Sequence, residues 1–229
     1  MCSEGAAYSH KLKYAYVGIV FRPKTTLGDT PSDSSIEAMI TRIRGSLEKK
    51  PGKGLSDTEH SSLPKAAVCM VLKPDATTNQ LLVLLLKRKV SDSDPWSGHM
   101  AFPGGRANSA DLDLANTAYR EVMEETSIDF RKCELLGTLD DLLPGNRLLG
   151  VKPFVLLGPA SIEVKIDGRE IADYVWIPLD FFMDKKNSSK LQLQSFGINH
   201  EVASFAYLGS HVIWGMTLRI IEDFLSKIQ

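Results

Sequence analysis

Cysteine is scarce in this sequence of 229 residues, which has only Cys2, Cys69 and Cys133. The three are odd in number, widely spaced and form no CxxC or His/Cys metal-ligand pattern. This pattern argues against a disulfide framework and against a thiolate metal centre. We therefore expect reduced thiols in a reducing compartment.

Long apolar runs are missing as well. None approaches the roughly 20 residues that a helix needs to cross a bilayer. The N-terminal stretch is interrupted by charge and lacks the order of a signal peptide, and the last residues are not a peroxisomal address. We expect a cytoplasmic protein without a membrane partner.

Charge of one sign is not in excess, because 27 Lys and Arg face 28 Asp and Glu. A net charge of −1 provides no broad basic field to hold a nucleic-acid backbone, so we expect no nucleic-acid partner. Lys and Arg near a site can still bind a small anion. Apolar residues make up 43% of the chain, which is ordinary for a globular protein with a sizeable core.

The first 63 residues differ in composition from the rest, and we divide the chain into an N-terminal extension (1–63) and a main domain (64–229). An amphipathic helix is predicted over roughly 35–49, followed by a polar linker over 53–64. The helix prediction rests on apolar residues at helical spacing, with serines before and a Pro-Gly pair after: Ile36, Met39, Ile40, Ile43, Leu47, Ser34, Ser35, Pro51 and Gly52.

Strand patterns begin after the linker. Residues 66–72 and 81–86 read as a hairpin whose unbroken apolar runs predict strands buried on both faces. Further strands are predicted over 134–139, 152–157, 163–166, 174–177, 191–194 and 203–207, and helices over about 112–126 and 214–227. Mixed strands with a few helices predict an α/β layered sandwich.

Three acidic residues gather on the helix predicted over 112–126. Glu121 and Glu125 are four residues apart and share one helix face, which Glu124 borders. Carboxylates so close repel one another, and a hard divalent cation such as Mg²⁺ or Mn²⁺ would remove that repulsion. Arg120 can hold one carboxylate in place by a charge-assisted hydrogen bond.

A glycine pair lies upstream of this cluster, in Pro103-Gly104-Gly105. Two glycines allow the backbone to come close to a metal ion or a phosphate. The acidic residues alone also fit an ordinary solvated helix face. The loop and the helix together are far more specific than either part.

The combined stretch resembles the Nudix box, G-x5-E-x7-R-E-U-x-E-E-x-G-U, in which U is a bulky aliphatic residue. Six positions match in register: Arg120, Glu121, Val122, Glu124, Glu125 and Ile128. Ser127 replaces the last Gly of the pattern. With Gly105 as the first Gly, the box is one residue longer and Asp111 takes the place of the first Glu, which leaves the role of Asp111 open.

The resemblance extends over about 64–228 and is closest to the coenzyme A diphosphatase-like Nudix proteins. It rests on residues 95–105, 151–155, 175–179 and 213–219. The chain departs from that subgroup where Leu86 replaces the Thr of its additional motif and Met100 replaces the Gln. The resemblance implies a Nudix-type α/β/α sandwich with a mixed β-sheet.

Residue roles also follow from the resemblance. The metal ligands would be Glu121 and Glu125, with the Gly105 carbonyl as a further ligand and Glu124 as a ligand or as the base acting on water. Glu124, Glu125 and Arg120 would form the catalytic group. The implied cofactor is Mg²⁺ or Mn²⁺.

Four further residues are candidates for substrate binding, each with a structural alternative. Arg106 follows the glycine pair and Arg88 ends a predicted strand, so either can meet a phosphate or remain a solvated charge. His99 can touch substrate, act as a base, or serve only as a hydrogen-bonded loop residue. Glu170 precedes a predicted strand and is either an acidic group of the site or a surface charge.

The implied activity is hydrolysis of a diphosphate linkage in a nucleotide-like small molecule, with coenzyme A or an acyl derivative favoured. ADP-ribose, a dinucleotide or a damaged nucleoside triphosphate is the alternative substrate class. A non-catalytic ligand sensor is a second alternative, disfavoured because every carboxylate of residues 120–125 is present. The resemblance also leaves a homodimer open.

Substitution of Glu124 or Glu125 by Gln should abolish turnover while the protein still folds, because the amide removes charge without changing side-chain size. A single general base contributes about 10²–10⁴-fold to the rate. Steady-state rates and circular dichroism of each variant test this. A variant that is nearly as active as the unchanged protein would contradict the assigned roles.

Overall fold

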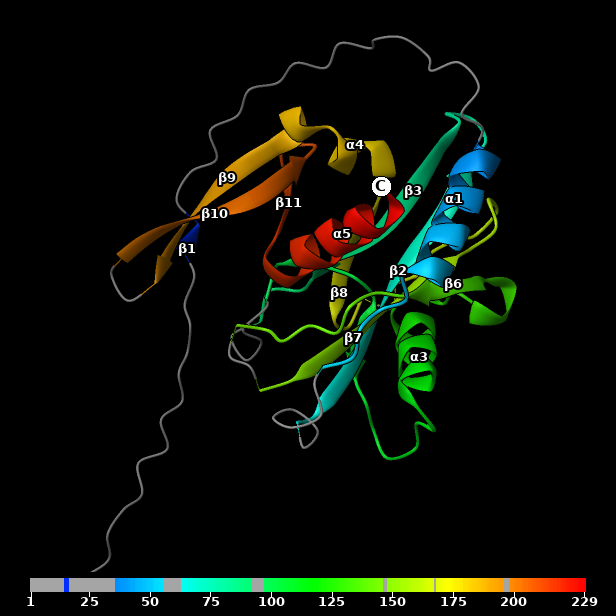
Figure 1. Cartoon of the computed structure of the whole chain (residues 1–229). Helices are drawn as coiled ribbons and strands as arrows, with labels where there is room; N and C mark the ends of the chain where they lie inside the picture. The colour runs from blue at the N-terminus through cyan, green and yellow to red at the C-terminus, as the bar shows by residue number, and fades with distance from the viewer. Residues whose placement is uncertain are drawn as a thin grey trace, which may run out of the picture.

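A computed structural model of the chain describes residues 15–16, 36–55, 63–91, 97–145, 148–166, 168–195 and 198–229. Within these ranges the strands form a seven-stranded sheet and a four-stranded sheet (Figure 1). The larger sheet has the order β4-β3-β2-β7-β6, with β5 paired to β2 and β8 paired to β3. The smaller sheet has the order β1-β9-β10-β11.

The centre of the larger sheet is a mixed set of three strands. β2 (Lys65–Asp75) pairs antiparallel with β3 (Gln80–Arg88), which confirms the predicted hairpin, and parallel with β7 (Gly150–Leu157). Successive residues of β2 enter different cores: Ala66, Val68, Met70 and Leu72 face one side, and Ala67, Cys69 and Val71 the other. The strand is buried on both faces, as its unbroken apolar run predicts.

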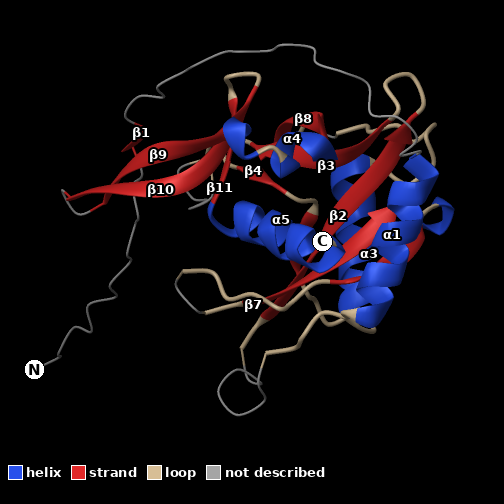
Figure 2. Ribbon diagram, turned by 45° about the horizontal axis from the view of Figure 1, so that its top comes forward, coloured by secondary structure: helices blue, strands red, loops and turns tan. Residues whose placement is uncertain are grey.

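Helices cover both faces of the larger sheet, which confirms the predicted α/β sandwich (Figure 2). α3 (Leu114–Thr126) packs its buried Ala118 and Val122 on one face. α1 (Ile36–Lys49) and α5 (Gly215–Ile228) cover the opposite face. Because α1 packs into this core, part of the predicted extension contributes to the domain; the boundary at residue 63 stays a prediction.

The remaining strands of the larger sheet lie at its edges and ends. They are β4 (Met100–Ala101), β5 (Gly104–Arg106), β6 (Glu134–Thr138) and β8 (Ile171–Pro178). A short 3-10 turn, η1 (Phe130–Lys132), joins α3 to β6. The ends of β3, β5 and β8 surround the candidate site described below.

The smaller sheet follows α4 (Leu179–Met183) and η2 (Lys185–Asn187). It consists of β9 (Ser188–Ser195), β10 (Ile198–Tyr207) and β11 (His211–Trp214), with β1 (Ala15–Tyr16) at the edge of β9. Figure 1 shows the β9–β10 hairpin extending away from the larger sheet. Aromatic side chains join the hairpin to the core through ring contacts between Phe181, Phe182, Phe205 and Tyr207.

Most predicted elements are confirmed, with boundaries displaced by a few residues. The strand predicted over 163–166 is wrong: this segment is irregular, with Val164 buried against the core and the Lys165 N–H donating to the Thr126 carbonyl. Four strands, β1, β4, β5 and β11, lay outside the predictions because they are short and one carries two glycines. The predicted caps Ser34 and Ser35 lie outside the described residues. In the part of the chain that is described, no helix is both long and apolar enough to cross a membrane.

A buried lysine ties the end of α5 to the loop after β6. Lys227 is 7% exposed, and its Nζ lies 2.7 Å from Asp140 Oδ1 and 3.8 Å from Asp223 Oδ1. A charge in such a place is stable only while its partners remain.

We expect Lys227→Met to lower the free energy of unfolding by about 2 kcal/mol, because it leaves partly buried carboxylates without their cation. Lys190→Met is the matched control: Lys190 is 72% exposed beside Glu201, and its loss should cost less than about 0.5 kcal/mol. Urea unfolding measures both values. Equal losses in the two variants would contradict a special role for the buried pair.

Candidate active site

The glycine pair lies in β5, pressed between β2 and α3. A Cβ on Gly104 would lie 2.4 Å from the Ala67 carbonyl oxygen, and its φ of +153° is one that side-chain-bearing residues rarely adopt. A Cβ on Gly105 would lie 2.5 Å from the carboxylate of Glu121. Gly104 therefore requires glycine, because a side chain there would collide with the backbone of β2, and a side chain at Gly105 would displace the Glu121 carboxylate.

α3 carries the acidic residues, and its two ends are capped. Asp113 caps the start, with its side chain accepting from the Asn116 N–H at 2.8 Å. Ser127 caps the end in the left-handed conformation, φ 56°, at a position where the Nudix pattern has Gly. The Ser127 hydroxyl donates to the Lys165 carbonyl, so the helix-to-strand turn forms despite the replacement.

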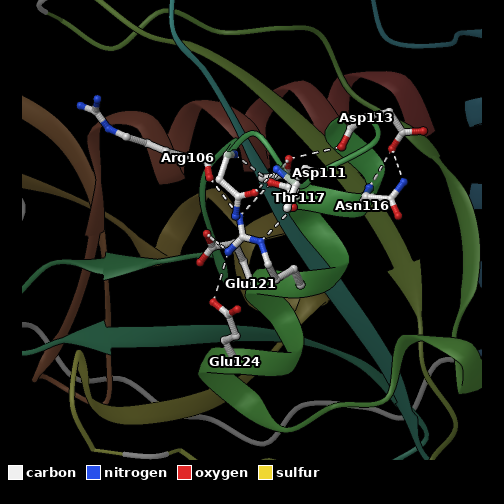
Figure 3. A network of polar contacts seen from close by, with 10 residues as sticks. Arg106, Asp111, Asp113, Asn116, Thr117, Glu121 and Glu124 are labelled. Carbon is white, nitrogen blue, oxygen red and sulfur yellow. Dashed lines mark hydrogen bonds and ion pairs between the residues drawn. The ribbon is translucent and has the colours of Figure 1, made fainter.

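Arg120 joins the loop after the glycines to the acidic helix face. Figure 3 shows its partners Asp111, Glu121 and Glu124. Its Nε and Nη2 donate to the two carboxylate oxygens of Asp111, each at 3.0 Å. Its Nη1 donates to Glu121 at 2.8 Å and to Glu124 at 3.2 Å, and its Nη2 also donates to the Arg106 carbonyl. One guanidinium thus sets the positions of three carboxylates.

The sequence left the role of Asp111 open, and the structure pairs this residue with Arg120. Its side chain is 6% exposed and accepts from Arg120, from the Asn108 N–H and from the Thr117 hydroxyl. These hydrogen bonds, led by those from Arg120, hold the pKa of Asp111 well below its usual range. The additional residue of the box lies between Asp111 and Arg120, where residues 112–119 number eight in place of seven. The sequence already carried an indication, an acidic residue between the glycines and Arg120.

Glu125 is the most enclosed of the three glutamates, with the residue 8% exposed. Its Oε2 accepts from the Gly104 N–H at 2.9 Å. Burial raises the pKa of Glu125 to about 7, against the effect of this hydrogen bond and of Arg88, while Glu121 and Glu170 raise it further. Burial also raises the pKa of Glu121, against the hydrogen bond from Arg120.

Glu124 is the exposed member of the three glutamates. Its side chain is 56% exposed and turns toward Arg120, as Figure 3 shows. Over the described ranges, no three His, Cys, Asp or Glu side chains are close enough together to hold a metal ion. The residues present nevertheless suit a hard cation: Glu121 and Glu125 are desolvated, repel each other and adjoin a glycine backbone that no side chain shields.

The structure brings two of the four substrate-binding candidates to the acidic pair. Arg88 favours the charged form of Glu125, and Glu170 disfavours that of both Glu121 and Glu125, so both lie within electrostatic reach. His99 lies next to Arg88, because its carbonyl accepts from the Arg88 N–H. Its ring packs edge-on against Trp214, with the ring centres 4.9 Å apart. Arg106 is exposed, and its guanidinium points away from the Arg120 network (Figure 3).

Comparison with known proteins agrees with this geometry. The model of the NUDIX domain matches residues 63–194, which is more than half of the chain. The chain belongs to the Nudix family. It is therefore a hydrolase that acts on phosphorus anhydrides, in a family that generally uses divalent metal ions.

Two curated Nudix relatives align over most of their own length. The chain is 29% identical over 195 residues to the uncharacterized Nudix hydrolase NudL of Photorhabdus laumondii, covering 85% of this chain and 98% of that protein. It is 33% identical over 168 residues to NudL of Yersinia pestis strain Pestoides F, covering 72% and 79%. A solved structure, a MutT/nudix family protein from Enterococcus faecalis, shares the fold with a TM-score of 0.50 at 18% identity, covering 86% of this chain and 70% of that one.

Asp111→Asn should lower kcat/KM by about tenfold, since the amide keeps one acceptor oxygen but loses the charge and the second acceptor that hold Arg120, which orients Glu121 and Glu124. Asp113→Asn is the matched control two residues away, because Asn caps a helix as well as Asp does. Steady-state hydrolysis and Mn²⁺ titration calorimetry compare the two. Similar losses in both variants would show that Asp111 has no particular role in the site.

Proposed function

We propose that this Nudix hydrolase cleaves a diphosphate linkage in a nucleotide-like small molecule with Mg²⁺ or Mn²⁺ as cofactor. The observation that carries the proposal is the enclosure of Glu125 beside Glu121 at the glycine pair, where the pKa of Glu125 rises to about 7. Carboxylates that burial makes harder to ionise gain from a divalent cation, which stabilises their charged form.

The ligands would be the carboxylates of Glu121 and Glu125 and the carbonyl of Gly105. When bound there, a divalent cation neutralises diphosphate oxygens and lowers the pKa of a bound water. The Gly104 N–H fixes one oxygen of Glu125 and Arg120 fixes one oxygen of Glu121, so both ligands are oriented before substrate arrives.

Glu124 is the best-placed candidate for the base that takes a proton from the attacking water, or for an additional ligand. Its carboxylate is exposed and held loosely by Arg120 at 3.2 Å. Such a group can accept a proton from solvent-accessible water, which the enclosed Glu125 cannot do as readily. Arg120 then stabilises the site as a whole, since it contacts Glu121 and Asp111 as well.

Arg88 is the leading candidate for contact with a substrate phosphate, because its charge already acts on Glu125. Glu170 adds negative charge near both ligands and fits a supporting role at the cation. His99 and Arg106 stay candidates for substrate contact. Arg106 would need to meet a part of the substrate outside the Arg120 network.

Coenzyme A or an acyl derivative is the favoured substrate. The support is the resemblance of residues 95–105, 151–155, 175–179 and 213–219 to the coenzyme A subgroup. The replacements at Leu86 and Met100 keep ADP-ribose, dinucleotides and damaged nucleoside triphosphates as the alternative class.

Assay of these substrates with Mg²⁺ and with Mn²⁺, followed by chromatography of the products, tests the proposal. Coenzyme A should yield 4′-phosphopantetheine and 3′,5′-ADP as the main reaction. Glu125→Gln should lower kcat by at least about 10²-fold, whereas the exposed Glu222→Gln on α5 should leave it unchanged. Preference for ADP-ribose or a triphosphate would replace the favoured substrate, and activity without any divalent cation would refute the mechanism.

A further inference from the structure

In the segment that leads into the glycine pair, the sheet leaves the carbonyl of Met100 without a partner. In the ladder between β3 and β4, Lys87 pairs with Met100, and the adjacent Arg88 N–H donates to the His99 carbonyl at 3.0 Å. Hydrogen-bonded and non-hydrogen-bonded pairs alternate in antiparallel ladders, so the Met100 carbonyl points away from β3. Met100 is 3% exposed, and a buried carbonyl needs a donor from elsewhere.

That donor is Thr217, in the first turn of α5. Its Oγ1 donates to the Met100 carbonyl at 2.9 Å, and the residue is 6% exposed. Beside it, Trp214 at the start of the same helix packs edge-on against His99. Figure 2 shows α5 beginning next to β11 and β4. The start of α5 therefore contacts two successive residues of the segment, His99 and Met100.

A displacement of the Met100 backbone would be transmitted to Glu121 and Glu125 through a short length of chain. Only Ala101, Phe102 and Pro103 separate Met100 from Gly104, whose N–H holds Glu125. The Pro103 carbonyl accepts from the Cys69 N–H, which anchors the same segment to β2. The Thr217 bond differs from these backbone contacts because it comes from a side chain, which a substitution can remove.

We propose that Thr217 is a positioning residue for the hydrolysis reaction: its hydroxyl anchors the Met100 carbonyl and thereby sets the place of Gly104, Gly105 and Glu125. This inference rests on the proposed function, in which Glu125 and Gly105 bind the divalent cation. Thr217 acts through the backbone and does not contact substrate. Motion of well under 1 Å in reacting or orienting groups is enough to reduce rates strongly.

Thr217→Val keeps the shape of the side chain and removes its donor, and Thr217→Ser restores the donor. We expect Val to lower kcat by about tenfold while KM changes by less than about threefold, and Ser to retain activity within about threefold of the unchanged enzyme. Ser204→Ala is the matched control, because it removes a buried hydroxyl that bonds Ser189 in the smaller sheet. Its kcat should not change.

Hydrogen exchange provides a readout that does not depend on substrate. Amides of residues 97–106 should exchange at least about tenfold faster in Thr217→Val than in the unchanged protein or in Thr217→Ser, with α1 unaffected. If Thr217→Val does not fold, Thr217→Ala removes the same donor from a smaller side chain and replaces it in both measurements.

A donor-less variant with unchanged exchange and kcat would overturn the proposal, as would a Ser variant as impaired as Val. An equal loss of kcat in Ser204→Ala would show that removal of any buried hydroxyl lowers kcat through general destabilisation. That result would also overturn the proposal. If the unchanged protein cleaves none of the diphosphates, the proposed function fails, while the exchange measurement still decides whether Thr217 anchors the segment.

Discussion

The backbone of the glycine pair lies closer to β2 and to α3 than any residue with a side chain would permit. A methyl group at Gly104 would overlap the backbone of β2, and one at Gly105 would overlap the carboxylate of Glu121. This close approach places the Gly104 N–H on Glu125 and leaves the Gly105 backbone facing Glu121. The enclosure of both acids, and the raised pKa of each, follow from it.

Carboxylates that lie close together in an enclosed site repel one another. The positive charge of Arg120 offsets this repulsion. Its guanidinium is shared between Asp111 on the loop and two glutamates on the helix. A planar group with several donors in fixed directions orients carboxylates more strictly than a lysine would. The aspartate has a shorter side chain than the glutamate of the Nudix pattern, and it still contacts Arg120 with one additional residue between the two.

Local patterns were enough to predict the hairpin of β2 and β3, the helices α1, α3 and α5, and most of the longer strands. Each of these has a period that burial on one or both faces imposes on the sequence. Residues 163–166 show the limit: an apolar and polar alternation predicts a strand, yet Val164 is buried as part of an irregular segment. The strand β5 lay beyond prediction, because glycines favour no strand and only the shape of its neighbours makes one there.

The sequence by itself determined the kind of chemistry. A helix face repeats every three to four residues, so spacing alone places the three acids together. The arginine before them and the glycine pair upstream are equally visible in the sequence. Only the tertiary structure decided which acids are enclosed, because burial of Glu125 and exposure of Glu124 depend on β5 and not on the helix. It also decided that Asp111 binds Arg120 and that Thr217 reaches Met100. These contacts join residues distant in the chain, whose approach depends on the packing of the whole domain and not on any local period.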